Sequence, residues 1–160
     1  MNTEQASAQA LNIPYMENLC VAIVQARWNS HITDALTAGA VEYLKSQGYA
    51  DENIEVHKVT GTIELTFAAA RLMETGDYDA IIEIGCVIKG DTPHFDFVCQ
   101  SVTDGCTQLN AKAQIPVLFG VITTLNEQQA LDRAGGSAGN KGAEAAAAAL
   151  EMIDFARKIK

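Results

Sequence analysis

The stretch from residue 81 to residue 98 constrains the fold more than any other part of the chain. Residues 81–88 form an apolar run rich in β-branched side chains, and such a run predicts a buried strand. A polar loop with Lys89 and Thr92 follows, and the next segment begins at His94. The stretch therefore predicts a strand, a loop and a helix start, with an ionisable group where α/β sheets usually hold ligands.

Three further strands are predicted from shorter runs. Residues 19–25 and 116–122 are mostly apolar, which indicates buried strands. Residues 54–59 alternate between apolar and polar side chains, as an edge strand with one less buried side does. His57 falls on the polar side of this strand, so we interpret it as an exposed structural histidine.

Segments with apolar residues at helical spacing separate these strands. Asn29 or Ser30 is predicted to cap the first helix, which stops at residues 47–48. Asn126 begins a capping-box pattern that opens a short helix ending at Ala134. The other predicted helices span residues 65–75, 95–112 and about 142–156, and residues 135–140 are predicted to form a flexible connector.

This alternation predicts an α/β fold. It is a flavodoxin-like, three-layer sandwich, with a central four-stranded parallel sheet and helices on both faces. Residues 1–15 are polar and lack periodicity, so we expect a mobile N-terminal arm followed by a single domain over residues 16–160.

Composition excludes several classes of partner. The net charge of −9 argues against a nucleic acid or an anionic membrane surface. No apolar run approaches the ~20 residues of a membrane span, and the N-terminus lacks the features of a secretory signal. The four cysteines form no C-x-x-C pair, which favours reduced thiols in a cytoplasmic protein. The three histidines lack the spacing of metal ligands, so no metal is expected.

The loops after the four strands should meet at one edge of the sheet. Trp28 offers a flat apolar face, and Glu64 offers a hydrogen-bond acceptor. Lys89 and Thr92 suit an anion, while His94, with an ordinary pKa of about 6.5, suits proton transfer. This set favours a planar heterocycle, an anionic co-substrate and acid–base chemistry.

The same residues also have plainer interpretations. A lone tryptophan is more often part of a core, and a histidine at a helix start is as often structural as catalytic. For Arg133 and Lys141, the alternative interpretation is a solvated surface charge. The chain contains neither a G-x-G-x-x-G motif nor a phosphate-binding Walker loop, which counts against nucleotide cofactors.

Several blocks nevertheless resemble one family closely. The sequence G-C-V-I-K-G-D-T-P-H-F-D-F-V at residues 85–98 resembles the signature of the lumazine synthases of riboflavin biosynthesis. The matching blocks follow in the family's order and spacing from about residue 18 to residue 156. They lie at residues 26–29, 61–65, 116–121, 129–135 and 139–146.

The resemblance implies a reaction. Such enzymes condense 5-amino-6-(ribitylamino)uracil with 3,4-dihydroxy-2-butanone 4-phosphate to 6,7-dimethyl-8-ribityllumazine, and they release phosphate and water. The family uses no metal and no organic cofactor. His94 matches the proposed general acid/base, and Trp28 matches the aromatic that stacks on the pyrimidine. We expect the remaining substrate contacts at Asn29, Thr62, Ile63, Glu64, Cys86, Val87, Ile88, Lys89, Asp91, Thr92, Phe119, Arg133 and Lys141.

Family resemblance also implies an assembly. It implies a homopentamer with active sites between subunits, in which Phe119 and Arg133 come from the neighbour. Some members pack twelve pentamers, about 60 subunits, into a hollow shell. Longer connectors accompany members that stop at pentamers, and the short connector here leaves both assemblies open.

Three departures from the family pattern bear on substrate affinity. Thr60 and Ile63 replace a usual proline and a frequent aromatic, and Lys89 replaces a frequent arginine. Ser137 and Ala138 stand where many members carry lysine and histidine. Two alternatives therefore stay open: a catalytically weakened paralogue that binds lumazine or flavin, and a cage-forming scaffold protein.

Overall fold

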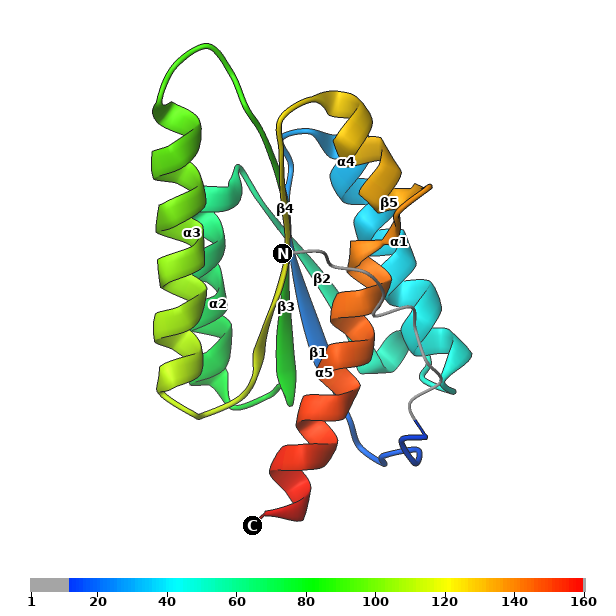
Figure 1. Ribbon diagram of the computed structural model, residues 1–160. Helices are drawn as coiled ribbons and strands as arrows, with labels where there is room; N and C mark the ends of the chain where they lie inside the picture. The colour runs from blue at the N-terminus through cyan, green and yellow to red at the C-terminus, as the bar shows by residue number, and fades with distance from the viewer. Residues whose placement is uncertain (1–11, 160) are drawn as a thin grey trace.

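The computed structural model describes residues 12–159 and contains a central sheet between two layers of helices (Figure 1). The four main strands are parallel and lie in the order β2-β1-β3-β4. The strands are β1 (Val21–Ala26), β2 (Ile54–Val59), β3 (Ala80–Ile88) and β4 (Val117–Thr124). The helices are α1 (Ser30–Ser46), α2 (Leu65–Thr75), α3 (His94–Ala111), α4 (Glu127–Arg133) and α5 (Lys141–Lys158). The predicted three-layer α/β fold is confirmed.

The helices divide between the two faces of the sheet in a way that follows from chain direction. The step from β1 to β2 runs one way, whereas the steps from β2 to β3 and from β3 to β4 run the other way. Crossovers of one hand then require α1 on the opposite face from α2 and α3. In Figure 1, α2 and α3 indeed cover one face, while α1, α4 and α5 cover the other.

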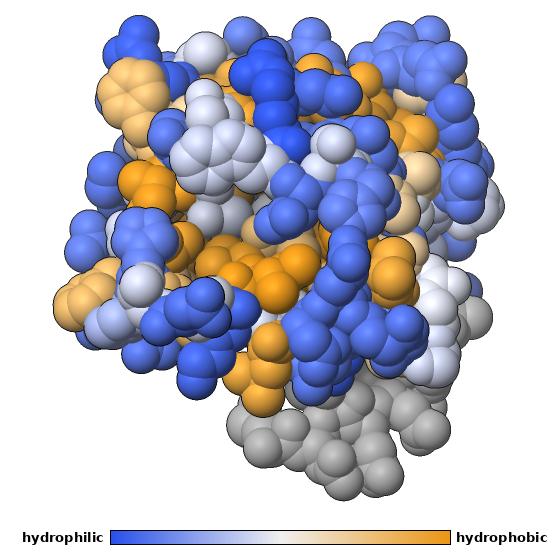
Figure 2. Space-filling model, turned by 90° about the horizontal axis from the view of Figure 1, so that it is seen from above, coloured by the Kyte–Doolittle hydropathy of each residue, from blue (hydrophilic) through white to orange (hydrophobic). Residues whose placement is uncertain are grey.

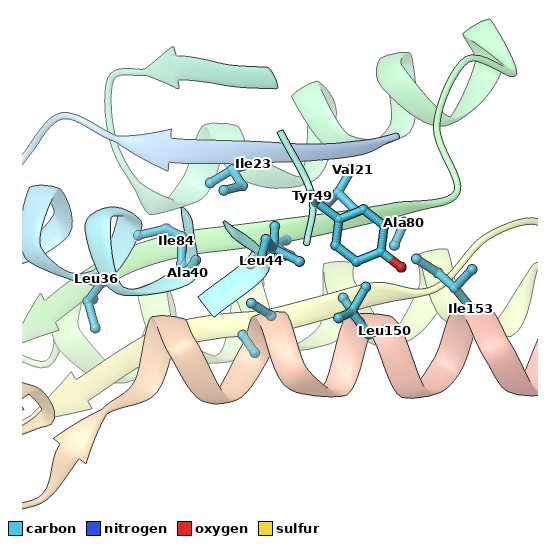
Figure 3. Close-up of a cluster of buried hydrophobic side chains, with 14 of the residues drawn as sticks. Val21, Ile23, Leu36, Ala40, Leu44, Tyr49, Ala80, Ile84, Leu150 and Ile153 are labelled. Atoms are coloured by element: carbon cyan, nitrogen blue, oxygen red, sulfur yellow. The ribbon is translucent and has the colours of Figure 1, made fainter. Parts of the chain in front are cut away.

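Each face has its own apolar core. One cluster packs α1 and α5 against the sheet, with Leu36, Leu44 and Leu150 among its members (Figure 3). The second cluster packs α2 and α3 against the other face, around Leu65 and Val102. Because β1 lies between these cores, all six of its residues are buried, which explains its apolar sequence.

The edge strand was predicted correctly, since β2 lies at the end of the sheet and is half-buried to exposed along its length. Two local predictions were wrong. Asn29 occupies the predicted N-cap position of α1, but its side chain makes no capping hydrogen bond, because its amide donates to the Cys86 carbonyl oxygen instead. The expected flexible connector contains a short antiparallel pair, β5 (Ala134–Gly136) with β6 (Gly139–Asn140).

The N-terminal arm of residues 1–15 falls mainly outside the described residues, which begin at residue 12. Within its last part, Tyr15 stacks on Tyr49 with ring centroids 4.9 Å apart. The backbone N–H of Met16 donates to the Tyr49 hydroxyl at 3.0 Å. Among the described helices, none is both long and apolar enough to cross a membrane.

Candidate active site

The carboxyl ends of the strands meet at the edge of the sheet seen from above in Figure 2, where apolar residues are exposed between hydrophilic ones. The loop after β1 leads to α1 on one face, and the loop after β3 leads to α3 on the other. Because the two loops diverge, a crevice opens between these strand ends. This is the topological switch point, where open α/β sheets bind ligands.

A pocket of about 190 Å³ lies at this switch point. It brings together most of the residues that were predicted to hold the heterocycle. Its lining residues are Ala26, Trp28, Asn29, Thr62, Ile63, Cys86, Val87, Ile88, His94 and Val98.

Trp28 packs on the backbone of Gly61 at the pocket wall. A Cβ added to Gly61 would lie 2.7 Å from Cε3 of Trp28, so only glycine admits the indole here. The side chain of Glu64 reaches the same place, with Oε2 3.3 Å from that Cβ position. Trp28 is nevertheless 65% exposed, so it is not a core residue and its ring is free to stack on a ligand.

Thr62 is fixed in the pocket by a second glycine. A Cβ added to Gly85 would lie 2.4 Å from Cγ2 of Thr62, so the bare backbone of β3 receives the threonine methyl group. Thr62 opens a single 3₁₀ turn, Thr62–Glu64, and is buried. The next residue, Ile63, is 47% exposed and points an apolar surface to the pocket opening.

Asn29 joins the ends of the two central strands. Its side-chain Nδ2 donates to the carbonyl oxygen of Cys86 at 3.0 Å. Asn29 has a φ of 58°, in the left-handed region that asparagine tolerates better than most residues. The bond fixes the turn that carries Trp28 against β3.

Cys86 lines the pocket as a neutral thiol. Burial, with a smaller contribution from the Glu127 carboxylate, raises the pKa of Cys86 to about 11. A thiol with this pKa is a poor nucleophile near neutral pH. The arrangement therefore gives the Cys86 side chain a packing role.

The loop after β3 joins Ile88 to His94, and both of these residues line the pocket. Lys89, Asp91 and Thr92 are exposed and do not line the pocket. Thr92 Oγ1 accepts a long hydrogen bond, 3.4 Å, from the backbone N–H of His94. His94 is the first residue of α3, and within residues 12–159 its ring makes neither a hydrogen bond nor an ion pair. The ring is therefore available to a substrate.

The other predicted residues lie in a second hollow, of about 620 Å³, beside β4 and α5. Phe119 is 42% exposed there, and Arg133 Nη1 donates to the carbonyl oxygen of Gln129 at 3.0 Å. Lys141 lies 2.8 Å from Glu144. One chain therefore does not bring Phe119, Arg133 and Lys141 into the pocket of Trp28 and His94.

Sequence reasoning missed two residues of the first pocket, Ala26 and Val98. Val98 follows His94 by four residues, so helical spacing places the two on one side of α3. Ala26 ends β1, directly before the loop that carries Trp28 and Asn29. Nothing in the sequence marked Glu144 of the second hollow as a site residue, because a glutamate in the first turn of a helix is common.

Comparisons with known proteins agree on one family. The sequence model described as 6,7-dimethyl-8-ribityllumazine synthase matches residues 18–157. The enzyme of that name from Bacteroides fragilis is 59% identical over 133 residues, which are 83% of this chain and 93% of the relative. The one from Phocaeicola vulgatus is 50% identical over 149 residues, 93% of this chain and 89% of the relative. The one from Porphyromonas gingivalis is 50% identical over 146 residues, 91% of each chain.

Proposed function

This chain belongs to the 6,7-dimethyl-8-ribityllumazine synthase family, and we propose that the pocket at the switch point is its active site. There it condenses 5-amino-6-(ribitylamino)uracil with 3,4-dihydroxy-2-butanone 4-phosphate, and it releases phosphate and water. The observation that carries this proposal is the meeting of Trp28 and His94 in one pocket. A flat apolar surface then faces the pyrimidine, and a free imidazole lies beside it.

In this proposal the pocket orients the pyrimidine before any bond forms. Trp28 stacks on the ring, and Ile63 covers its edge in place of the aromatic that is frequent in the family. Asn29, Thr62 and Glu64 hold polar groups of the ring and of the ribityl chain. Backbone groups at Cys86, Val87 and Ile88 read the ring edge. Orientation of two reactants can supply up to roughly 7–11 kcal/mol of the barrier.

The proposed chemistry needs protons moved in both directions. The amine adds to the ketone to give a carbinolamine, which loses water to form an imine. Phosphate then leaves as an anion. The ribityl-bearing amine attacks the remaining carbonyl carbon, and loss of a second water completes the lumazine ring. His94 gives and takes these protons, since its imidazole has no competing partner among the described residues. Lys89, Asp91 and Thr92 form the loop that receives the phosphate.

We further propose that the site is completed by a neighbouring subunit in a homopentamer. Arg133 of the neighbour then holds the phosphate with its planar guanidinium, with Phe119 and Lys141 beside it. Two observations support this: the second hollow is separate from the pocket, and Phe119 is exposed in the single chain. The short β5–β6 hairpin is compatible with a shell of pentamers. The four free cysteines suit the cytoplasm.

An absorbance assay with both substrates tests the proposal. The lumazine chromophore should form faster with the protein than in the enzyme-free mixture, and Trp28→Ala should raise the KM for the pyrimidine. If only the spontaneous background appears while a flavin analogue still binds, the chain is a binding paralogue. If neither reaction nor binding is seen, a scaffold role remains.

A further inference from the structure

A side-chain hydrogen bond between a histidine and a glutamate links the beginnings of two helices that border the two parts of the site. Nε2 of His31, in the first turn of α1, lies 2.5 Å from Oε1 of Glu127, the first residue of α4. The two residues are 96 positions apart in the chain. Both side chains are partly exposed, 53% for His31 and 60% for Glu127, so the contact is not forced by core packing.

On the α1 side, this pair adjoins the first pocket. His31 comes two residues after Asn29, whose side chain is bonded to the Cys86 carbonyl. The Glu127 carboxylate is also near enough to Cys86 to help raise the pKa of that thiol. The pair therefore adjoins the turn that carries Trp28, without lining the pocket itself.

On the α4 side, the pair adjoins the turn that positions Arg133. The Asn126 side chain accepts a hydrogen bond from the Gln129 backbone N–H at 2.9 Å, which closes the first turn of α4. The carbonyl of the same Gln129 accepts the bond from Arg133 Nη1 at 3.0 Å. Arg133 and Glu127 are thus the two ends of the same short helix, which has fewer than two full turns.

We propose that His31 and Glu127 are positioning residues, whose contact holds α4 on α1 and so fixes Arg133 relative to the Trp28 turn. This rests on the proposed function, because it assumes that Arg133 binds the substrate phosphate. Helix α4 has only seven residues, too few to be stable alone, so tertiary contacts must hold it in place. Ala130 anchors the helix in the core, and the His31–Glu127 contact holds its first residue. In the pentamer, the pair would connect the pocket of one active site with the phosphate half of the next.

The expected effect is small and specific. An exposed contact of this kind contributes little to global stability, so unfolding should hardly change. Misplacement of Arg133 should instead raise the KM for the phosphate-bearing ketone by about threefold. His31→Ala and Glu127→Ala should each give this rise with kcat unchanged. The double variant should show no further rise, because either change alone breaks the same contact. His31→Gln, which keeps a donor near Nε2, should stay close to the unaltered protein.

A matched control exists at the other end of α1. Lys45 and Asp51 form an exposed ion pair at 2.7 Å, and Lys45→Ala should leave the KM unchanged. Two results would overturn the proposal. One is that His31→Ala and Glu127→Ala have additive effects on the KM, and the other is that Lys45→Ala raises the KM equally.

A second measurement does not depend on activity. Amide hydrogen exchange over residues 127–133 should be faster in His31→Ala and in Glu127→Ala than in the unaltered protein. Unchanged exchange there rejects the positioning role even if the protein shows no synthase activity. Absence of lumazine formation by the unaltered protein would reject the proposed function instead, and the exchange result would still decide the role of the pair.

Discussion

Glu83 is a fully buried carboxyl group in the middle of β3. Neither of its oxygens has a hydrogen-bond partner among the described residues. Burial raises the pKa of Glu83 to about 7, and the one titratable side chain that affects it is Cys106 of α3. Burial, with a contribution from Glu83, in turn raises the pKa of the Cys106 thiol to about 12. Both groups are therefore neutral in slightly acidic solution.

The buried acid should make stability depend on pH. The folded chain keeps the Glu83 proton up to about pH 7, whereas the unfolded chain releases it near 4.5, so stability falls as pH rises between these values. The loss amounts to about 3 kcal/mol at most, and it stays constant above pH 7. Glu83→Gln should remove this part of the pH dependence. Thermal unfolding from pH 5 to 8.5 measures it, and parallel profiles for the two proteins would contradict the prediction.

His94 is predicted to contribute acid–base catalysis but not the whole rate. His94→Ala should lower kcat by roughly 10²-fold, since a positioned histidine typically contributes 10²–10⁴-fold and orientation remains. His57→Ala is the matched control, because His57 lies on β2 beside Tyr78 and lines neither hollow. Steady-state rates with both substrates test this. Complete loss of activity with an intact fold would show that His94 does more than move protons.

At the scale of elements, α1 and α5 pack unusually closely. A Cβ added to Gly142 would lie 1.9 Å from the carbonyl oxygen of Leu36, and one added to Gly39 would lie 2.3 Å from the Asn140 side chain. Asn140 fills the crossing, with Nδ2 donating to the Ala35 carbonyl and Oδ1 accepting from the Ala143 N–H. The small residues thus let polar groups of one helix reach the other.

Gly142→Ala should therefore destabilise the subunit. The added methyl group would clash with the backbone carbonyl of Leu36, which cannot move aside as a flexible side chain can. Overpacking of this kind lowers the free energy of unfolding by about 1–3 kcal/mol. The melting temperature should fall by several degrees. Gly90→Ala serves as the control, because a Cβ there meets nothing within 4 Å. Equal melting temperatures for the two variants would mean that α5 shifts to accommodate the methyl group.

For the whole molecule, the sequence predicted what depends on local pattern. The four strands, the edge position of β2 and the pocket residues Trp28 and His94 all follow from periodicity and the family signature. The partners that side chains find in the folded chain were not predictable from local pattern. Asn29 was expected to cap α1 but bonds to Cys86, 57 residues away in the chain. The buried run of β3 was predicted, but nothing in it indicates that the Glu83 carboxyl group has no hydrogen-bond partner among the described residues. The separation of the two hollows follows from no local pattern, and only the family resemblance, which assigns Phe119 and Arg133 to a neighbouring subunit, gave reason to expect it.

That separation gives the last prediction. If Arg133 acts in the pocket of a neighbouring subunit, His94→Ala and Arg133→Ala damage different halves of the site. Co-expressed chains purified through two different tags should form mixed rings in which about a quarter of the sites have both native halves, because neighbours combine at random. Lumazine formation should then exceed that of either variant alone by a wide margin. A site contained within one chain predicts only the average of the two variants, since every chain in the mixture is damaged. Differently tagged copies of a single variant provide the control, as no combination of them restores a native half.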